Sequence, residues 1–103
     1  MRNHAIGVFD SGLGGLTCVK ELKRLLPNES IIYFGDTGRV PYGTRSKETI
    51  VKYVRQNINF LSTFDVKVIV AACGTASTLA LLEAQAMSRV PVIGVLDGAV
   101  SGA

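Results

Sequence analysis

The alternation of apolar runs with helix-like segments constrains the fold most strongly. Apolar runs of strand length occupy residues 5–9, 31–34, 66–72 and 90–96. Nearly continuous apolar runs are typical of parallel strands buried on both faces. Strands that alternate with helices require a parallel sheet whose helices cover its faces. We therefore predict an α/β fold in the order βαβαβαβ, an open doubly wound parallel sheet of about four strands with flanking helices.

The segments between the apolar runs carry apolar residues at helical spacing. The predicted helices cover residues 16–26, residues 47–64, and a third segment from Thr75 or Ser77 to about Ser88. Ser46 is of the type that caps a helix, so the second helix is expected to begin at the next residue. In the third helix we expect the core-facing side chains to be Leu79, Leu82 and Ala86.

Composition excludes several classes of protein. Eleven Lys and Arg against eight Asp and Glu give a charge of +3, and the scattered basic residues do not form the face of a nucleic-acid binder. The longest charge-free run, 68–82, falls short of the roughly 20 residues that span a bilayer. Cys18 and Cys73 lack metal-ligand spacing and are too few for a secreted disulfide fold. We expect one cytoplasmic domain, residues 1–103, with no metal and no nucleic-acid or membrane partner.

Most of the candidate chemistry follows the predicted strands. In an open parallel sheet, ligands bind beyond the carboxyl ends of the strands. Those ends carry Asp10 and Ser11, residues 35–37, residues 73–75, and Asp97. Cys73 precedes a predicted helix, whose dipole favours a thiolate that can act as nucleophile or general base. A buried core cysteine is the alternative for Cys73. Cys18 lies within the first predicted helix, away from the strand ends, and is expected to pack.

Two turns add weaker signals. The glycine-rich turn 12–15 opens a helix and offers backbone N–H groups to an anion. However, Thr17 stands where a dinucleotide fingerprint needs glycine, and Asp10 would repel a phosphate, so nucleotide binding is the weakest interpretation. The loop 35–45 exceeds the usual ~2–6 residues. It contains Tyr42 and Gly43, which suit either ligand contact or a plain surface turn.

Four segments together resemble a known family. GVFDSGLGGLT, YFGDTGRVPYGTRSKETI, VIVAACGTAS and VPVIGVLDGA are similar, in order and spacing, to the amino-terminal half of bacterial glutamate racemases. These belong to the cofactor-independent aspartate/glutamate racemases. The resemblance implies one of two similar domains, no cofactor, and a two-base interconversion of L- and D-glutamate that supplies D-glutamate for peptidoglycan synthesis.

The resemblance also assigns residues. Cys73 matches the first of two catalytic cysteines, which face opposite sides of the substrate α-carbon, one from each domain. The positions that match substrate contacts are Asp10, Ser11, Tyr42, Gly43, Gly74 and Thr75. Gly74 departs from the family, which has asparagine there, so a side-chain amide that would contact substrate is absent.

No residue matches the second catalytic cysteine, and four strands are fewer than the five or six of known open sheets. We therefore expect a truncated form that lacks the second domain and has reduced or no activity alone. A homodimer in which each copy supplies Cys73 is a further hypothesis. The alternative function is a non-catalytic substrate-binding or interaction module of the same fold. The preference between glutamate and aspartate stays open.

Overall fold

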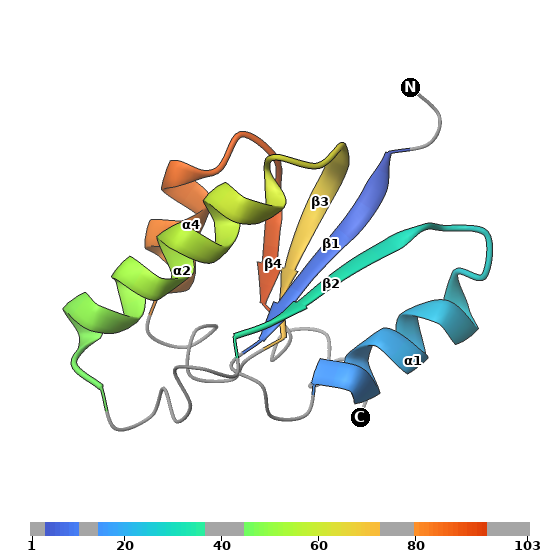
Figure 1. The fold of residues 1–103 in the computed structure, drawn as a ribbon, viewed down its shortest axis with the longest axis horizontal. Coiled ribbons are helices and arrows are strands. Elements are labelled where there is room, and N and C mark those ends of the chain that lie inside the picture. Colours follow the sequence, from blue (N-terminus) through green and yellow to red (C-terminus); the bar gives the residue numbers. More distant parts are fainter. Residues whose placement is uncertain (1–3, 11–14, 37–44, 73–79, 95–103) are drawn as a thin grey trace.

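The computed structural model describes residues 4–10, 15–36, 45–72 and 80–94. In chain order the elements are β1 (Ala5–Asp10), α1 (Gly15–Leu25), β2 (Ile31–Gly35), α2 (Lys47–Leu61), β3 (Val66–Ala71), α4 (Leu81–Met87) and β4 (Val92–Gly94) (Figure 1). This order confirms the predicted alternation of strands and helices. The predicted start of the third helix, at Thr75 or Ser77, lies outside the described residues.

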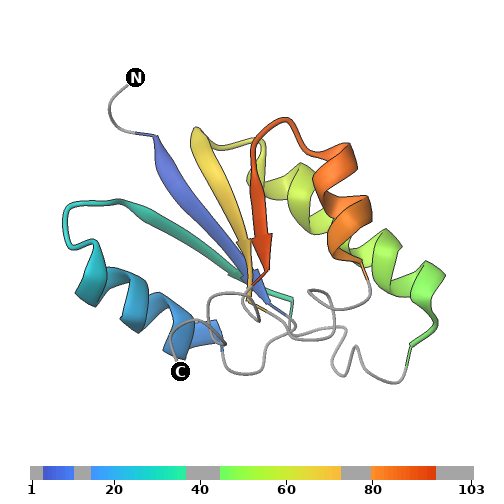
Figure 2. The same ribbon diagram turned by 180° about the vertical axis from the view of Figure 1, so that it is seen from behind.

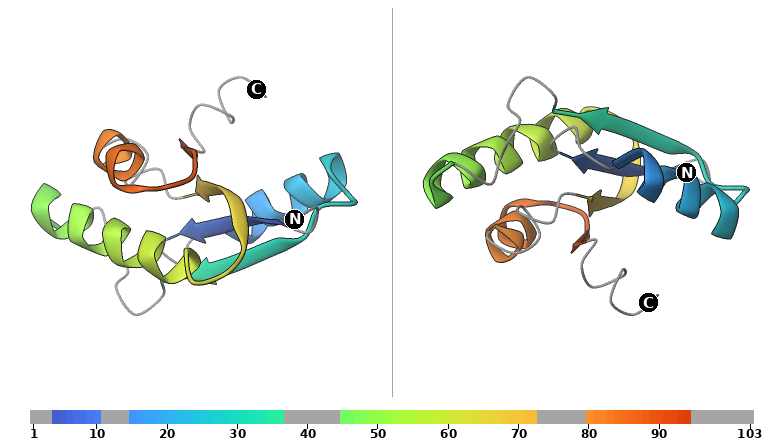
Figure 3. Two further views of the ribbon diagram at one scale, coloured as in Figure 1. Left: turned by 90° about the horizontal axis from the view of Figure 1, so that it is seen from above. Right: turned by 90° about the horizontal axis from the view of Figure 1, so that it is seen from below.

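The strands form one parallel sheet in the order β2-β1-β3-β4. The connection from β2 to β3 therefore crosses over β1, and every residue of β1 is buried. Helices α2 and α4 lie together on one face, whereas α1 lies on the other (Figures 2 and 3). The open doubly wound α/β class is thus confirmed. Asp10 pairs with Gly35 and Phe9 with Ala71, so the carboxyl ends of the first three strands are level.

The main core lies between the sheet and the α2/α4 layer. Its fully buried members include Phe9 from β1 and Ile69 from β3. Because side chains alternate along a strand, Phe9 faces this core and the next residue, Asp10, faces the α1 side. The helices contribute Ile50, Val54, Ile58, Leu61 and Ala84.

The α1 side of the sheet is covered less completely than its apolar sequence suggested. Helix α1 packs chiefly on β1 and β2. On β3, Val68 and Val70 are only half-buried, and Ile93, which pairs with Val70, is 47% exposed. The prediction that β3 is buried on both faces was therefore only partly correct. Lys67, the charged residue of this strand, is exposed and pairs with Glu29 at 2.5 Å.

Helix α2 begins where the sequence predicted. The side chain of Ser46 accepts a hydrogen bond from the backbone N–H of Thr49 at 3.2 Å, which confirms it as the N-cap. The helix ends at Leu61, earlier than the predicted residue 64. The last residues turn more tightly, because the N–H of Phe64 donates to the carbonyl of Leu61 and the Thr63 hydroxyl donates to that of Phe60.

Helix α4 presents a different face to the core from the one expected. Ala84 is 1% exposed, whereas Leu82 is 78% exposed and Ala86 is also exposed, so the predicted face was wrong. The small side chains of Ala80 and Ala84 let this segment approach α2 and β4, with which α4 packs. Leu79, the third residue of the predicted face, lies outside the described residues.

Candidate functional site

Backbone hydrogen bonds tie the ends of three strands into one edge. The N–H of Asp36 donates to the carbonyl of Asp10 at 2.9 Å, which joins the end of β2 to that of β1. The N–H of Ala72 donates to the carbonyl of Phe9 at 2.8 Å, which joins the end of β3 to β1. Ala72 immediately precedes Cys73 in the chain. The ends of the first three strands therefore meet as topology predicted, with Asp10 at the centre, whereas Asp97 lies outside the described residues.

Asp10 is a buried carboxylate with a phenol donor. Its exposed fraction is 0%, and the Tyr33 hydroxyl lies 3.1 Å from Oδ1 and 3.0 Å from Oδ2. Tyr33 reaches across from β2, where it precedes Gly35, the register partner of Asp10, by two positions. A Cβ at Gly35 would lie 3.0 Å from the Tyr33 hydroxyl, so the glycine leaves room for this contact. Burying a charge is costly unless it is hydrogen-bonded, and Tyr33 supplies one such bond.

The contact changes the acidity of the phenol. Burial, followed by the hydrogen bond to Asp10 and the negative charge of Asp10, raises the pKa of Tyr33 to about 12. The hydroxyl therefore keeps its proton near neutral pH and acts as the donor. Sequence analysis did not single out Tyr33. The sequence signal that could have indicated this contact is the position of Tyr33, two residues before the glycine that ends β2. From that position a long side chain can reach a diagonal neighbour on the adjacent strand.

Cys18 lies near the start of helix α1, the element that follows β1 in the chain. It is half-buried in the first turn of α1, consistent with the expected packing role. Burial, and then the negative charge of Asp10, raise the pKa of its thiol. A raised pKa keeps the thiol protonated near neutral pH, which makes it a poor base.

A second carboxylate lies at the same edge. Asp36 follows β2 directly and is 7% exposed. Its backbone N–H is the group that binds the carbonyl of Asp10. The edge therefore carries two buried carboxylates, and the phenol of Tyr33 donates to that of Asp10.

The other predicted site residues cannot be placed relative to Asp10. Ser11, Tyr42, Gly43, Cys73, Gly74 and Thr75 lie outside the described residues. Their roles remain predictions, as does the role of Asp10 in binding substrate.

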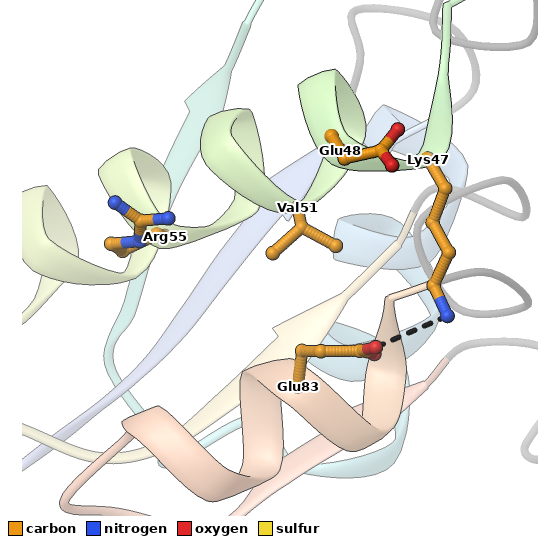
Figure 4. A pocket seen from close by; sticks show the side chains of 5 residues that line it. All are labelled: Lys47, Glu48, Val51, Arg55 and Glu83. Carbon is orange, nitrogen blue, oxygen red and sulfur yellow. Dashed lines mark ion pairs between the residues drawn. The ribbon is translucent and has the colours of Figure 1, made fainter.

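A shallow surface hollow of about 390 Å³ lies elsewhere, between α2 and α4 (Figure 4). It is lined by Lys47, Glu48, Val51, Arg55 and Glu83. Lys47 and Glu83 form an ion pair at 3.2 Å across the two helices. All of the lining residues come from helices, so the hollow is separate from the strand-end edge.

The described part of the chain contains neither a cluster of metal ligands nor a helix that could span a membrane. Within it, no three His, Cys, Asp or Glu residues gather as a set of metal ligands. None of its helices has both the length and the apolar character needed to cross a bilayer.

Comparison with known proteins gives a consistent result. No protein-family model matches the chain. The glutamate racemase of Geobacter metallireducens is 53% identical over 93 residues, which are 90% of this chain and 34% of that protein. The chain thus spans about a third of the length of this relative, less than the half that the sequence resemblance suggested.

Solved structures agree with the sequence comparison. The glutamate racemase of Francisella tularensis, in complex with D-glutamate, matches with a TM-score of 0.90 and 51% identity over 98% of this chain and 39% of its own. A glutamate racemase isoform of Bacillus anthracis matches with a TM-score of 0.93 and 44% identity over 100% of this chain and 39% of its own. The chain is therefore similar in sequence and in fold to glutamate racemases over little more than a third of their length.

Proposed function

We propose that this chain carries one half of a glutamate racemase-type site, with Cys73 as the base that removes the α-proton of glutamate. The observation that carries the proposal is the position of buried Asp10 at the strand-end edge, with Ala72 hydrogen-bonded beside it. The relative from Francisella tularensis, which binds D-glutamate, supports the choice of substrate. Asp10, Ser11, Tyr42, Gly43, Gly74 and Thr75 would contact that substrate.

The chemistry needs both a base and stabilisation of charge. An α-proton of an amino acid is very weakly acidic, so its removal depends on a positioned base and on donors that stabilise the developing negative charge. Cys73 is the better candidate base of the two cysteines, because Cys18 has a raised pKa. Racemisation also requires an acid on the opposite face of the α-carbon.

That second group would come from a further domain or from a second copy of this chain. The product, D-glutamate, would serve peptidoglycan synthesis in the cytoplasm, a reducing compartment that suits a chain with only two cysteines. Sedimentation velocity at high protein concentration tests the second copy: a strict monomer contradicts the homodimer.

Solvent exchange at the glutamate α-carbon tests the assignment of Cys73. The chain is incubated in D₂O with L-glutamate or D-glutamate, and loss of the α-proton signal is followed by NMR. We expect exchange with the unchanged chain, none with Cys73→Ser, and full exchange with the matched control Cys18→Ser. Exchange that survives in Cys73→Ser removes Cys73 from the mechanism.

A non-catalytic binding module is the second candidate function. Gly74, in place of the family's asparagine, favours it, because a side-chain contact to substrate is lost at this position. Calorimetry with both enantiomers distinguishes the two functions: binding of glutamate without α-proton exchange supports the module and contradicts the half-site.

A further inference from the structure

We propose that Tyr33 is a positioning residue of the glutamate site, because its phenol fixes the orientation of the Asp10 carboxylate. This inference rests on the proposed function, which places Asp10 in contact with substrate. Tyr33 itself acts through Asp10 and is not proposed to touch the reacting atoms.

The first support is the symmetry of the contact. The Tyr33 hydroxyl lies at nearly equal distances, 3.1 and 3.0 Å, from the two carboxylate oxygens of Asp10. A donor shared between both oxygens resists rotation of the carboxylate in either direction. Asp10 is 0% exposed, so bulk water does not compete for this bond. The phenol thus holds the carboxylate in one orientation.

The second support is the space above Gly35. A Cβ at this position would lie 3.0 Å from the Tyr33 hydroxyl and 3.4 Å from Oδ1 of Asp10. The backbone of Gly35 has no left-handed φ, so alanine is compatible with the local backbone. Alanine at position 35 would therefore disturb the contact while both partner side chains stay in the protein. Gly35 is the residue that permits the pairing.

The third support is the protonation state of the donor. Burial and the negative charge of Asp10 keep the phenol protonated far above neutral pH. A carboxylate offers about four lone-pair sites, so the bond from Tyr33 does not use them all. Tyr33 can thus orient Asp10 without occupying all of its acceptor sites.

Calorimetric titration with glutamate tests the proposal on the full chain. Tyr33→Phe removes the donor, and Gly35→Ala crowds it. Each is expected to weaken glutamate binding by about tenfold or more, the effect of losing one hydrogen bond to a charged group. The controls are Tyr53→Phe on α2 and Ile58→Val in the core, which are expected to bind glutamate within twofold of the unchanged chain. Ile58→Val also lowers stability, so it separates lost positioning from general destabilisation.

An NMR titration without glutamate tests the contact between Tyr33 and Asp10. With tyrosines carrying ¹³C at Cζ, alkaline titration reports each phenol, and Tyr33→Phe identifies the signal of Tyr33. Asp10→Asn is expected to lower the pH at which Tyr33 titrates, because it removes the negative charge. An unchanged titration of Tyr33 overturns the proposed contact.

The outcomes separate the two proposals. Weaker binding in both Tyr33→Phe and Gly35→Ala, with the controls unaffected, supports the positioning role. If Tyr33→Phe binds glutamate as tightly as the unchanged chain, the positioning role is wrong but the proposed function is not contradicted. If the unchanged chain does not bind glutamate, the proposed function is refuted, and so is the positioning role that depends on it.

Discussion

The packing of α2 against the sheet allows a prediction about substitutions at two positions, Gly7 and Leu61. Leu61, at the end of α2, is 0% exposed and packs over Gly7 in the central strand. A Cβ at Gly7 would lie 3.4 Å from Cδ1 of Leu61 and from Cγ1 of Val66, and 3.6 Å from Cγ1 of Ile69. These are ordinary packing distances. A methyl group at position 7 would therefore lie in van der Waals contact with the end of the Leu61 side chain.

The magnitudes follow from this geometry. Leu61→Ala should lower the free energy of unfolding by about 2–5 kcal/mol, because the facing glycine has no side chain to fill the cavity. Gly7→Ala alone should change it by less than about 1 kcal/mol, because the methyl fits at van der Waals distance. In the double variant the new methyl borders the cavity left by Leu61 and makes it smaller. The double variant should then be more stable than the sum of the single effects by about 1 kcal/mol, close to the value of one buried methylene.

Urea unfolding monitored by circular dichroism measures all three variants. Leu82→Ala on α4 is the control, because a side chain that is 78% exposed should contribute less than about 0.5 kcal/mol. A loss below about 1 kcal/mol for Leu61→Ala would refute the burial argument. Strictly additive effects in the double variant would show that the side chains at positions 7 and 61 do not interact.

Three further predictions concern local features. Ser46→Ala should cost about 1 kcal/mol in urea unfolding while Ser46→Asp retains most of the stability, and equal losses would refute the cap. The pKa of Tyr33 is about 12 when folded and near 10 when unfolded, so its contribution to stability is complete below pH 10 and lost as pH rises towards 12. Between pH 10 and 12 the free energy of unfolding should fall less steeply in Tyr33→Phe than in the unchanged chain. Identical pH dependence in the two proteins would disprove the argument. In a Cys73→Ser background, Cys18 should react with a thiol reagent at pH 8 more slowly than free cysteine and faster after Asp10→Asn, whereas an unaltered rate would deny the influence of Asp10.

The strands and the strand-end edge were predictable because local patterns determine them. The apolar run that ends at Asp10 indicates a buried strand, and parallel topology brings the ends of such strands together. The contact between Tyr33 and Asp10 could not be predicted, since it joins residues 23 positions apart through register. Only the pairing of Asp10 with Gly35 brings the phenol within reach.

The helices show where local patterns fail. Apolar spacing placed Leu82 in the core, yet the structure buries Ala84 and exposes Leu82. The face that a short helix buries depends on how closely it approaches its neighbours, and small residues allow the closest approach. Tertiary packing therefore decided the orientation of α4. At the end of α2, hydrogen bonds of Thr63 and Phe64 tighten the last turn, which the apolar pattern does not encode.

The most direct test of glutamate binding at the strand-end edge is a ¹H–¹⁵N chemical-shift titration of the chain with D-glutamate and L-glutamate. We predict that the amide signals of Asp10, Gly35 and Asp36 shift with saturation, whereas those of Arg55 and Glu83, at the hollow between α2 and α4, remain in place. Saturable shifts at the hollow, or none at the strand-end edge, would contradict glutamate binding at that edge.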